Sequence, residues 1–215
     1  MYLPAHFKED RIPVLLDLIR AHPLAMLVTL EASGLVANHI PMEIDAQASE
    51  LGTLRGHVAR ANPMWTSHRG EVEAMAVFQG PAGYITPAYY ATKAETGKVV
   101  PTWNYAIVHA YGPLRTIEDA AWLRRLVEQL TDRHEAERAR ADGEPPWKVS
   151  DAPAGFIDGL LKAIVGIELP LTRIDGKWKV SQNRPAADRA GVVAGLTRGD
   201  DPEQHAMAKL VRERG

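Results

Sequence analysis

The segment Val99–Tyr111 gathers hydrogen-bonding and aromatic side chains at the start of an expected strand. Thr102, Trp103 and Asn104 offer a hydroxyl, an indole N–H and a carboxamide on successive residues. Because side chains alternate across a strand, Trp103 and Asn104 should point to opposite faces. Such a stretch suits a flat ligand, whose ring an aromatic side chain grips while amide groups bind its edges. On this segment alone, a buried strand with a core tryptophan is the favoured interpretation.

A second group of donors lies at residues 57–63, His-Val-Ala-Arg-Ala-Asn-Pro. Asn62 and Pro63 are typical of a helix start, where free backbone N–H groups and a positive dipole end favour anions. Arg60 adds a fork of donors suited to phosphate, and His57 adds one more. These residues predict a phosphate-binding site. The alternative, a surface arginine beside a histidine that ends a strand, is favoured without further evidence.

Residues 176–184 contain three cations, a hydroxyl and two amides at one strand end. Alternation places Lys179 on the face opposite Trp178, and the amides of Gln182 and Asn183 follow. A strand end so rich in donors, with no helix to cap, indicates a binding role. The alternative is a solvated hairpin arm.

His39, in the apolar stretch 36–41, is a minor further candidate, since a histidine in such a strand is more often a core residue than a ligand. Motifs typical of nucleotide-binding loops, serine hydrolases and zinc proteases are missing. The eight histidines are scattered and the chain has no cysteine, which excludes disulfides, zinc-thiolate sites and thiol catalysis. No metal site is expected.

The composition of the 215-residue chain is typical of a soluble globular protein, with 46% hydrophobic and 24% charged residues. No apolar run reaches the ~20 residues needed to cross a bilayer, and the first residues do not resemble a secretion signal. We therefore expect a cytoplasmic protein without a membrane partner. The net charge of −2 weakens a DNA-binding hypothesis without excluding a local basic patch.

The hydrophobic pattern predicts a mainly β, α+β chain in which strands come in runs and do not alternate with helices. Asp175-Gly176 predicts a hairpin turn, Thr116 with Asp119 resembles a capping box, and 135–144 reads as a solvated helix extension or a loop. Helices are expected over 10–21, 116–134, 156–164 and 202–212, strands over 24–30, 36–44, 51–58, 72–78, 84–90, 103–111 and 167–171 with a return strand that begins at 178–180, and a polar loop over 91–98. The pattern favours an antiparallel barrel with helices packed outside.

The chain resembles the FMN-binding negative transcriptional regulators of PaiB type, in stretches that keep their order along almost the whole sequence. The matching residues lie in 1–7 (MYLPAHF), 54–65 (LRGHVARANPMW), 77–85 (VFQGPAGYI), 100–105 (VPTWNY), 164–168 (IVGIE) and 176–183 (GKWKVSQN). One departure is the stretch 86–90, where relatives usually carry a serine and a tryptophan and this chain has Thr-Pro-Ala-Tyr-Tyr. A tyrosine can supply a similar stacking surface.

The resemblance implies an antiparallel FMN-binding split β-barrel that works as a homodimer with the flavin at the subunit interface. It also implies one domain over 1–190, with inserted helices at 116–164, and a polar tail over 191–215. The cofactor-binding candidates are His57, Arg60 and Asn62 for the phosphate, Thr102, Trp103 and Asn104 near the ring, Lys179, Gln182 and Asn183 to complete the pocket, and His39.

Three functions follow from this expectation. The first is an FMN-binding repressor of transcription, with promoter DNA as a partner; this role comes from the resemblance alone. The second is an FMN-dependent oxidoreductase, in which the cofactor carries the chemistry and the protein positions it. The third and weakest is a haem-binding split barrel, with His39 or His57 as the axial ligand.

Overall fold

The computed structural model describes residues 1–214, which form two compact units, each built from segments that are separate in the sequence. Unit 1 contains residues 1–22, 77–109 and 174 onward, and unit 2 contains residues 23–76 and 110–173. None of the helices in the described residues is both long and apolar enough to span a membrane. Each unit has a sheet built from antiparallel pairs, with helices packed against it.

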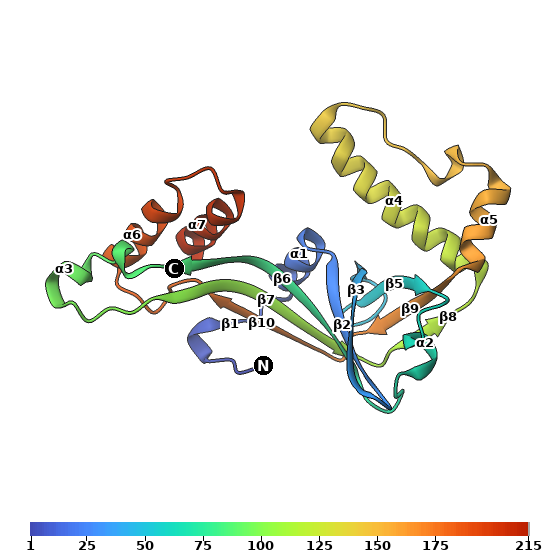
Figure 1. The fold of residues 1–215 in the computed structure, drawn as a ribbon, viewed down its shortest axis with the longest axis horizontal. Helices are drawn as coiled ribbons and strands as arrows, with labels where there is room; N and C mark the ends of the chain where they lie inside the picture. The colour runs from blue at the N-terminus through green and yellow to red at the C-terminus, as the bar shows by residue number, and fades with distance from the viewer. Residues whose placement is uncertain (215) are drawn as a thin grey trace. The chain divides into compact units, whose positions relative to one another are not determined.

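Unit 1 holds strands in the order β1-β10-β7-β6, with helices beside them (Figure 1). Its elements are β1 (Lys8–Glu9), α1 (Ile12–Ala21), most of β6 (Ala74–Ile85), α3 (Thr92–Thr96), most of β7 (Thr102–Gly112), β10 (Arg173–Lys179), α6 (Ala186–Leu196) and α7 (Pro202–Arg214), with 3-10 turns at Ala5–Phe7 and Pro87–Tyr89. The helices α6 and α7 pack side by side. The ring of Tyr89 lies against Gly195 of α6, so this tyrosine is a packing residue in the stretch that departs from the family pattern.

Unit 2 holds the hairpin β2–β3 and a sheet in the order β4-β5-β9-β8. Its elements are β2 (Leu24–Glu31), β3 (Gly34–Pro41), β4 (Glu43–Asp45), β5 (Thr53–Ala59), α2 (Met64–Ser67), β8 (Arg115–Ile117), α4 (Ala120–Asp142), a 3-10 turn at Val149–Asp151, α5 (Ala154–Lys162) and β9 (Ile164–Pro170). Strands β5 and β9 pair so that His57 lies opposite Gly166. A Cβ at Gly166 would come within 2.9 Å of the Trp122 ring, so this glycine lets α4 pack closely on the sheet.

Several sequence predictions are wrong in register or type. Asp175 and Gly176 lie inside β10, not in a turn, and Gly176 pairs with Glu9 of β1. A glycine is needed there because a Cβ would meet Leu15 of α1 and lie 2.7 Å from the carbonyl oxygen of Glu9. The turn signal of the Asp-Gly pair was therefore overridden by close helix–strand packing.

The long helix also differs from its prediction. Thr116 belongs to β8, and the cap is Asp119 alone, whose carboxylate accepts a hydrogen bond of 2.7 Å from the Trp122 backbone N–H. The charged stretch after His134 continues as helix to Asp142, as the extension interpretation requires. Residues 92–96 form the short helix α3 in place of a loop, and residues 87–89 form a 3-10 turn in place of a strand.

The polar C-terminal stretch is more ordered than the sequence suggests. The predicted helix over 202–212 is confirmed as α7, and α6 precedes it without having been predicted. Buried Asp188 of α6 accepts hydrogen bonds from the backbone N–H and the hydroxyl of Thr92, at 3.0 and 2.9 Å. The division into a domain over 1–190 and a tail over 191–215 stays a prediction.

Candidate functional site

In unit 1, the start of β7 and the end of β10 bring together most of the predicted ring-contacting residues. The ammonium of Lys179 donates to the Thr102 hydroxyl and, at 2.7 Å, to the Trp103 carbonyl oxygen. Because β7 and β10 are neighbours in the sheet, residues some 77 positions apart in the chain meet side by side. We call residues 102–104 and 177–184 the strand-end cluster.

Asn104 anchors this cluster from the buried side. Its side chain is 1% exposed, and its amide donates a hydrogen bond of 2.9 Å to the hydroxyl of Ser181, which is 3% exposed. Ser181 has a positive φ of 67°, which is uncommon for a residue with a side chain. This conformation turns the chain at the end of β10 and points the serine at Asn104.

Positive charge gathers at the strand-end cluster. Burial, followed by the charges of Lys177 and Arg184, lowers the pKa of Lys179 below its ordinary value. Within residues 1–214, none of these three cations forms an ion pair with an acidic side chain. An anion bound here would relieve the repulsion among them, as phosphate does in other cation clusters.

Two aromatic rings face solvent beside the same strand end. The Trp103 side chain is 58% exposed and Tyr84 is 51% exposed, with ring centroids 6.1 Å apart in an edge-to-face arrangement. The predicted alternation is confirmed, because Trp103 faces outward while Asn104 is buried. Exposed rings of this size are typical of surfaces that bind a flat ligand.

The two amides after β10 have different surroundings. The Gln182 side chain closes a turn, accepting from the Val180 backbone N–H at 2.8 Å and donating to the Trp178 carbonyl oxygen. Asn183 is exposed and forms no hydrogen bond with any residue the structure describes. Gln182 is therefore occupied in shaping the strand end, whereas Asn183 is free to reach a ligand.

In unit 2, the Arg60 guanidinium is bound to protein oxygens on all of its nitrogens. It donates to the carbonyl oxygens of Lys162 and Ile164, at 2.9 and 3.2 Å, and to the Glu118 carboxylate at 2.5 Å. It also lies 5.7 Å from the ring of Trp65. Arg60 thus links the end of β5 to the junction of α5 and β9, and a phosphate there would compete with Glu118.

The hydrogen-bonding groups of the Asn62 side chain also have partners within the protein. Its side-chain oxygen accepts from the Met64 backbone N–H at 3.0 Å, and its amide donates to the Asn38 side chain at 2.8 Å. The predicted capping interaction is present, although α2 begins one residue later than expected and has only four residues.

The two histidine candidates lie in unlike places. His39 is exposed on β3, opposite Met26 of β2. His57 of β5 lines an apolar cavity between the sheet and helices α4 and α5. No group of three or more histidine or acidic side chains within residues 1–214 is arranged to hold a metal ion.

Antiparallel sheets with helices packed against them are the architecture of the split-barrel class of protein, to which this chain belongs. Two solved structures share this fold: a FAD- and haem-binding protein of Mycobacterium smegmatis (TM-score 0.53, 16% identity, 80% of this chain and 73% of that one) and a conserved hypothetical protein of Mycobacterium tuberculosis (TM-score 0.55, 13% identity, 86% and 94%). At these identities the likeness shows the fold alone.

The family follows from the sequence comparisons. Residues 1–173 match the family described as "Putative FMN-binding domain", so the chain belongs to this family, and FMN is its cofactor. Its relatives include an uncharacterized protein of Emericella nidulans, 37% identical over 100% of this chain and 98% of that protein. The protease synthase and sporulation protein PAI 2 of Bacillus subtilis is 29% identical, again over 100% and 98%. The PaiB-type resemblance is confirmed.

The strand-end cluster fits FMN in its chemistry. It offers cations without acidic partners for a phosphate, exposed rings for an isoalloxazine, and a free amide for polar edges. Lys177, Arg184 and Tyr84 lie beside the predicted residues and were not among the residues predicted for the site. Tyr84 and Arg184 lie within the stretches 77–85 and 176–184, but only the folded chain brings them beside Trp103 and Lys179.

Proposed function

We propose that the strand-end cluster binds FMN and that the protein is a homodimeric, flavin-binding negative regulator of transcription of the PaiB type. The observation that carries the flavin site is a group of cations without acidic partners beside two exposed aromatic rings. FMN supplies redox chemistry when it is bound. The protein supplies the charge that holds the phosphate and the aromatic surface that holds the ring.

Residue roles follow from what each side chain still has to offer. Lys179 remains hydrogen-bonded to Thr102 and Trp103, which fixes its position while it donates its third hydrogen to phosphate. Trp103 stacks on the ring, and Asn104 holds the strand end rigid from below through Ser181. Asn183 binds a polar edge of the ligand. Arg60, Asn62 and His39 remain predictions as contributors to the site.

The hairpin β2–β3 supports the homodimer. Cross-strand pairs place eight side chains on its outward face, and seven are apolar: Leu24, Met26, Val28, Leu30, Leu35, Ala37 and Pro41, with His39 the eighth. Leu24 is 59% exposed and Leu35 is 77% exposed. A contiguous apolar face of this kind is typical of an interface between protein copies, and an isologous dimer would bury it twice. Light scattering of the purified protein tests the expected mass of two chains.

The regulator role rests on the PaiB-type resemblance. Its test is retardation of promoter DNA by the purified protein, with and without FMN, across a range of salt concentrations. Specific retardation that weakens steeply with salt would support the regulator. Consumption of reduced nicotinamide that depends on added FMN, without DNA retardation, would show the oxidoreductase instead. An intense Soret band would show the haem protein.

Titration of the apo-protein with FMN tests the flavin site itself. We expect saturable quenching of flavin fluorescence with one FMN per chain, because exposed tryptophan rings quench a stacked flavin. Trp103→Ala should weaken binding and remove most of the quenching, whereas Trp122→Phe, at a packed position in unit 2, should retain both. Equal binding by the Trp103→Ala variant would overturn the proposed ring contact.

A further inference from the structure

Unit 2 contains an apolar cavity of about 460 Å³ that the flavin proposal does not use. It lies between the end of β5, the start of β9 and the helices α4 and α5. Most of its wall is hydrocarbon or indole, supplied chiefly by Val127, Trp147, Ile157, Leu160, Leu161 and Ile164. Its volume is within the range of about 300–1,000 Å³ that is usual for small-molecule sites.

Two polar side chains interrupt the apolar wall, and neither has a partner. His57 of β5 forms no hydrogen bond or ion pair with any described residue, and its Nδ1 atom is buried without a partner. The hydroxyl of Thr131 on α4 likewise forms no hydrogen bond within residues 1–214. A buried polar atom without a partner costs free energy, so the Nδ1 atom of His57 indicates a ligand at this wall, and the partly exposed Thr131 hydroxyl offers such a ligand a second polar contact.

The site is built for an uncharged guest. Burial lowers the pKa of the His57 imidazole below its ordinary value of 6.5, so the ring is neutral at pH 7. Among residues 1–214, no lysine, arginine, aspartate or glutamate lines the cavity. An ionic ligand would lose its hydration without gaining a counter-charge, which would exclude it.

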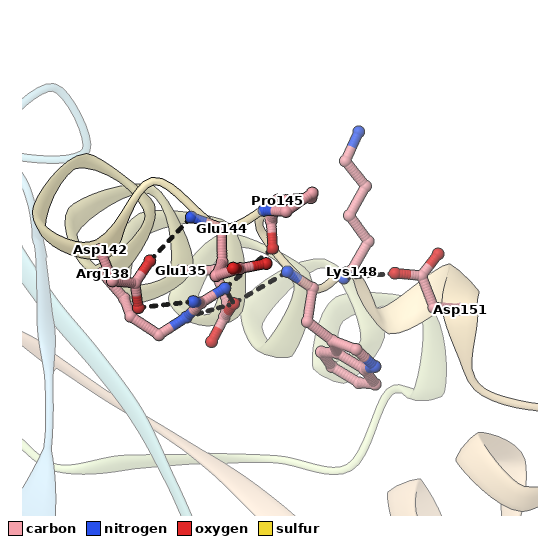
Figure 2. Close-up of polar contacts among 8 residues, drawn as sticks. Glu135, Arg138, Asp142, Glu144, Pro145, Lys148 and Asp151 are labelled. Carbon is pink, nitrogen blue, oxygen red and sulfur yellow. Dashed lines mark hydrogen bonds and ion pairs between the residues drawn. The ribbon is translucent and has the colours of Figure 1, made fainter.

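Hydrogen bonds hold the backbone that carries Trp147 against α4 without any ligand. Figure 2 shows Arg138 of α4 bound to Glu135 and Asp142. Arg138 also donates to the Pro145 carbonyl oxygen at 2.8 Å, and Glu135 accepts from the Trp147 backbone N–H at 2.8 Å. These bonds tie the segment after α4 back onto the helix.

The same hydrogen bonds keep the Glu135 carboxylate of this network charged. The hydrogen bonds from Arg138 and from the Trp147 backbone lower the pKa of Glu135, which keeps this carboxylate ionised. On the other side, the Lys148 backbone N–H donates to Asp151 at 2.9 Å and starts the turn toward α5 (Figure 2). The backbone of this wall is therefore ordered before a ligand binds, which lowers the entropic cost of binding.

We propose that this cavity binds a small, uncharged aromatic molecule that carries a hydroxyl group, of the phenol or naphthol class. The ring packs against Trp147 and the branched side chains of α4 and α5. The hydroxyl suits the two free groups, because one O–H donates and accepts, as an imidazole nitrogen and a threonine hydroxyl require. This ligand is distinct from FMN, and its site is independent of the flavin proposal.

The test uses the full-length protein and isothermal titration with three probes of one shape: 1-naphthol, 1-methylnaphthalene and 1-naphthoate. We expect saturable binding of 1-naphthol. Binding of 1-methylnaphthalene, which lacks the hydroxyl, should be weaker by roughly tenfold, the effect of a lost hydrogen bond. Binding of the 1-naphthoate anion should be weaker still.

Two substitutions test the residues. His57→Phe and Thr131→Val keep the side-chain volume and remove the polar group, so each should raise the Kd of 1-naphthol by roughly tenfold and leave that of 1-methylnaphthalene unchanged. His205→Phe, on an exposed histidine of α7, is the matched control and should bind all three probes like the wild type. If His57→Phe fails to fold, as judged by circular dichroism, the Kd of 1-naphthol for Thr131→Val tests the proposal alone.

Four outcomes overturn the proposal. The first is no saturable binding of 1-naphthol up to its solubility limit. The second is 1-naphthoate binding as tightly as 1-naphthol. The third is the Thr131→Val variant binding 1-naphthol like the wild type. The fourth is loss of 1-naphthol binding in the presence of saturating FMN, which would place the naphthol in the flavin site. Failure of FMN itself to bind would leave the naphthol result intact and would count only against the flavin proposal.

Discussion

The strand-end cluster of unit 1 and the Arg60 corner of unit 2 contain similar residue types in opposite states. In the cluster, Lys179 and its cationic neighbours have no acidic partner, and one neighbouring amide is free. At the corner, every nitrogen of Arg60 is bound to a protein oxygen. Cations that the fold leaves without an acidic partner can bind an anionic ligand, whereas a cation already paired with a carboxylate stabilises the chain.

The sequence presents both regions as phosphate-binding candidates, because an arginine before a helix start and lysines at a strand end have the same chemistry. Only the identity of their partners separates them. Those partners lie far away in the chain: Glu118, Lys162 and Ile164 for Arg60, and Thr102 for Lys179. Local patterns carry no information about such contacts.

The largest effect that would test this contrast is expected at Lys179. Lys179→Met removes a cation and a donor from the cluster while keeping much of the hydrocarbon chain. We expect the Kd for FMN to rise by roughly 10- to 150-fold, corresponding to the ~1.5–3 kcal/mol of a hydrogen bond to a charged group. Fluorescence titration measures this change. Lys93→Met, at an exposed position in α3, is the control and should leave the Kd unchanged; a normal Kd for Lys179→Met would break the contrast.

A second variant addresses the buried support of the cluster. Ser181→Ala removes the acceptor for the Asn104 amide, which is then buried without a partner. The free energy of unfolding should fall by ~1–3 kcal/mol, as measured by urea denaturation. Ser150→Ala, at an exposed site, should change it by less than ~0.5 kcal/mol. Equal free energies of unfolding for the two variants would show that the Asn104–Ser181 hydrogen bond does not stabilise the protein.

Arg60→Ala tests the other side of the contrast. The Arg60 side chain is 38% exposed and the Glu118 side chain is 58% exposed, so solvent screening reduces the value of the ion pair. We expect a loss of ~1 kcal/mol of stability, mainly from the two backbone carbonyl bonds. Arg69→Ala, at an exposed position, is the control. A rise of the FMN Kd beyond threefold in Arg60→Ala would show that this arginine also seats the phosphate, as the sequence predicts.

The smallest effect is a pH dependence. Burial lowers the pKa of His57, and of His22, in the folded state relative to the ordinary value of 6.5. As the pH falls below 6.5, the unfolded chain therefore takes up protons that the folded chain does not, and stability decreases. His57→Phe should make the loss between pH 7 and pH 5 shallower, by less than the ~1.4 kcal/mol per pH unit of one proton. Denaturation at several pH values measures the slope, and an unchanged slope would show that His57 does not titrate with folding.

The predictions that held came from local periodicity. The alternation of Trp103 and Asn104 and the helix α7 follow from side-chain patterns over a few residues. The errors arose where a distant segment overrides a local signal. Gly176 reads as a turn residue after Asp175, but it is required by the approach of Leu15 from α1. Thr116 reads as a cap, but it pairs with Ile167 in β8 and β9.

The cavity beside His57 was not predictable in the same way. Its wall combines residues from β5, α4 and α5, and its only sequence signal is a lone histidine in an apolar strand. The charged stretch 135–144 appeared featureless, yet it forms the network that holds Trp147 in place. A stretch without an apolar stripe can thus have a definite structural task.

The Arg138 network makes the cavity wall sensitive to the ionic medium. Its members lie at the surface, with Arg138 39% exposed and Asp142 44% exposed, so dissolved ions screen their attraction, and at about 1 M salt the Debye length is only ~3 Å. Concentrated salt therefore loosens the segment that carries the Trp147 indole, while leaving the hydrocarbon packing of α5 intact. We therefore expect ionic strength to change how readily a small molecule enters the cavity beside Trp147.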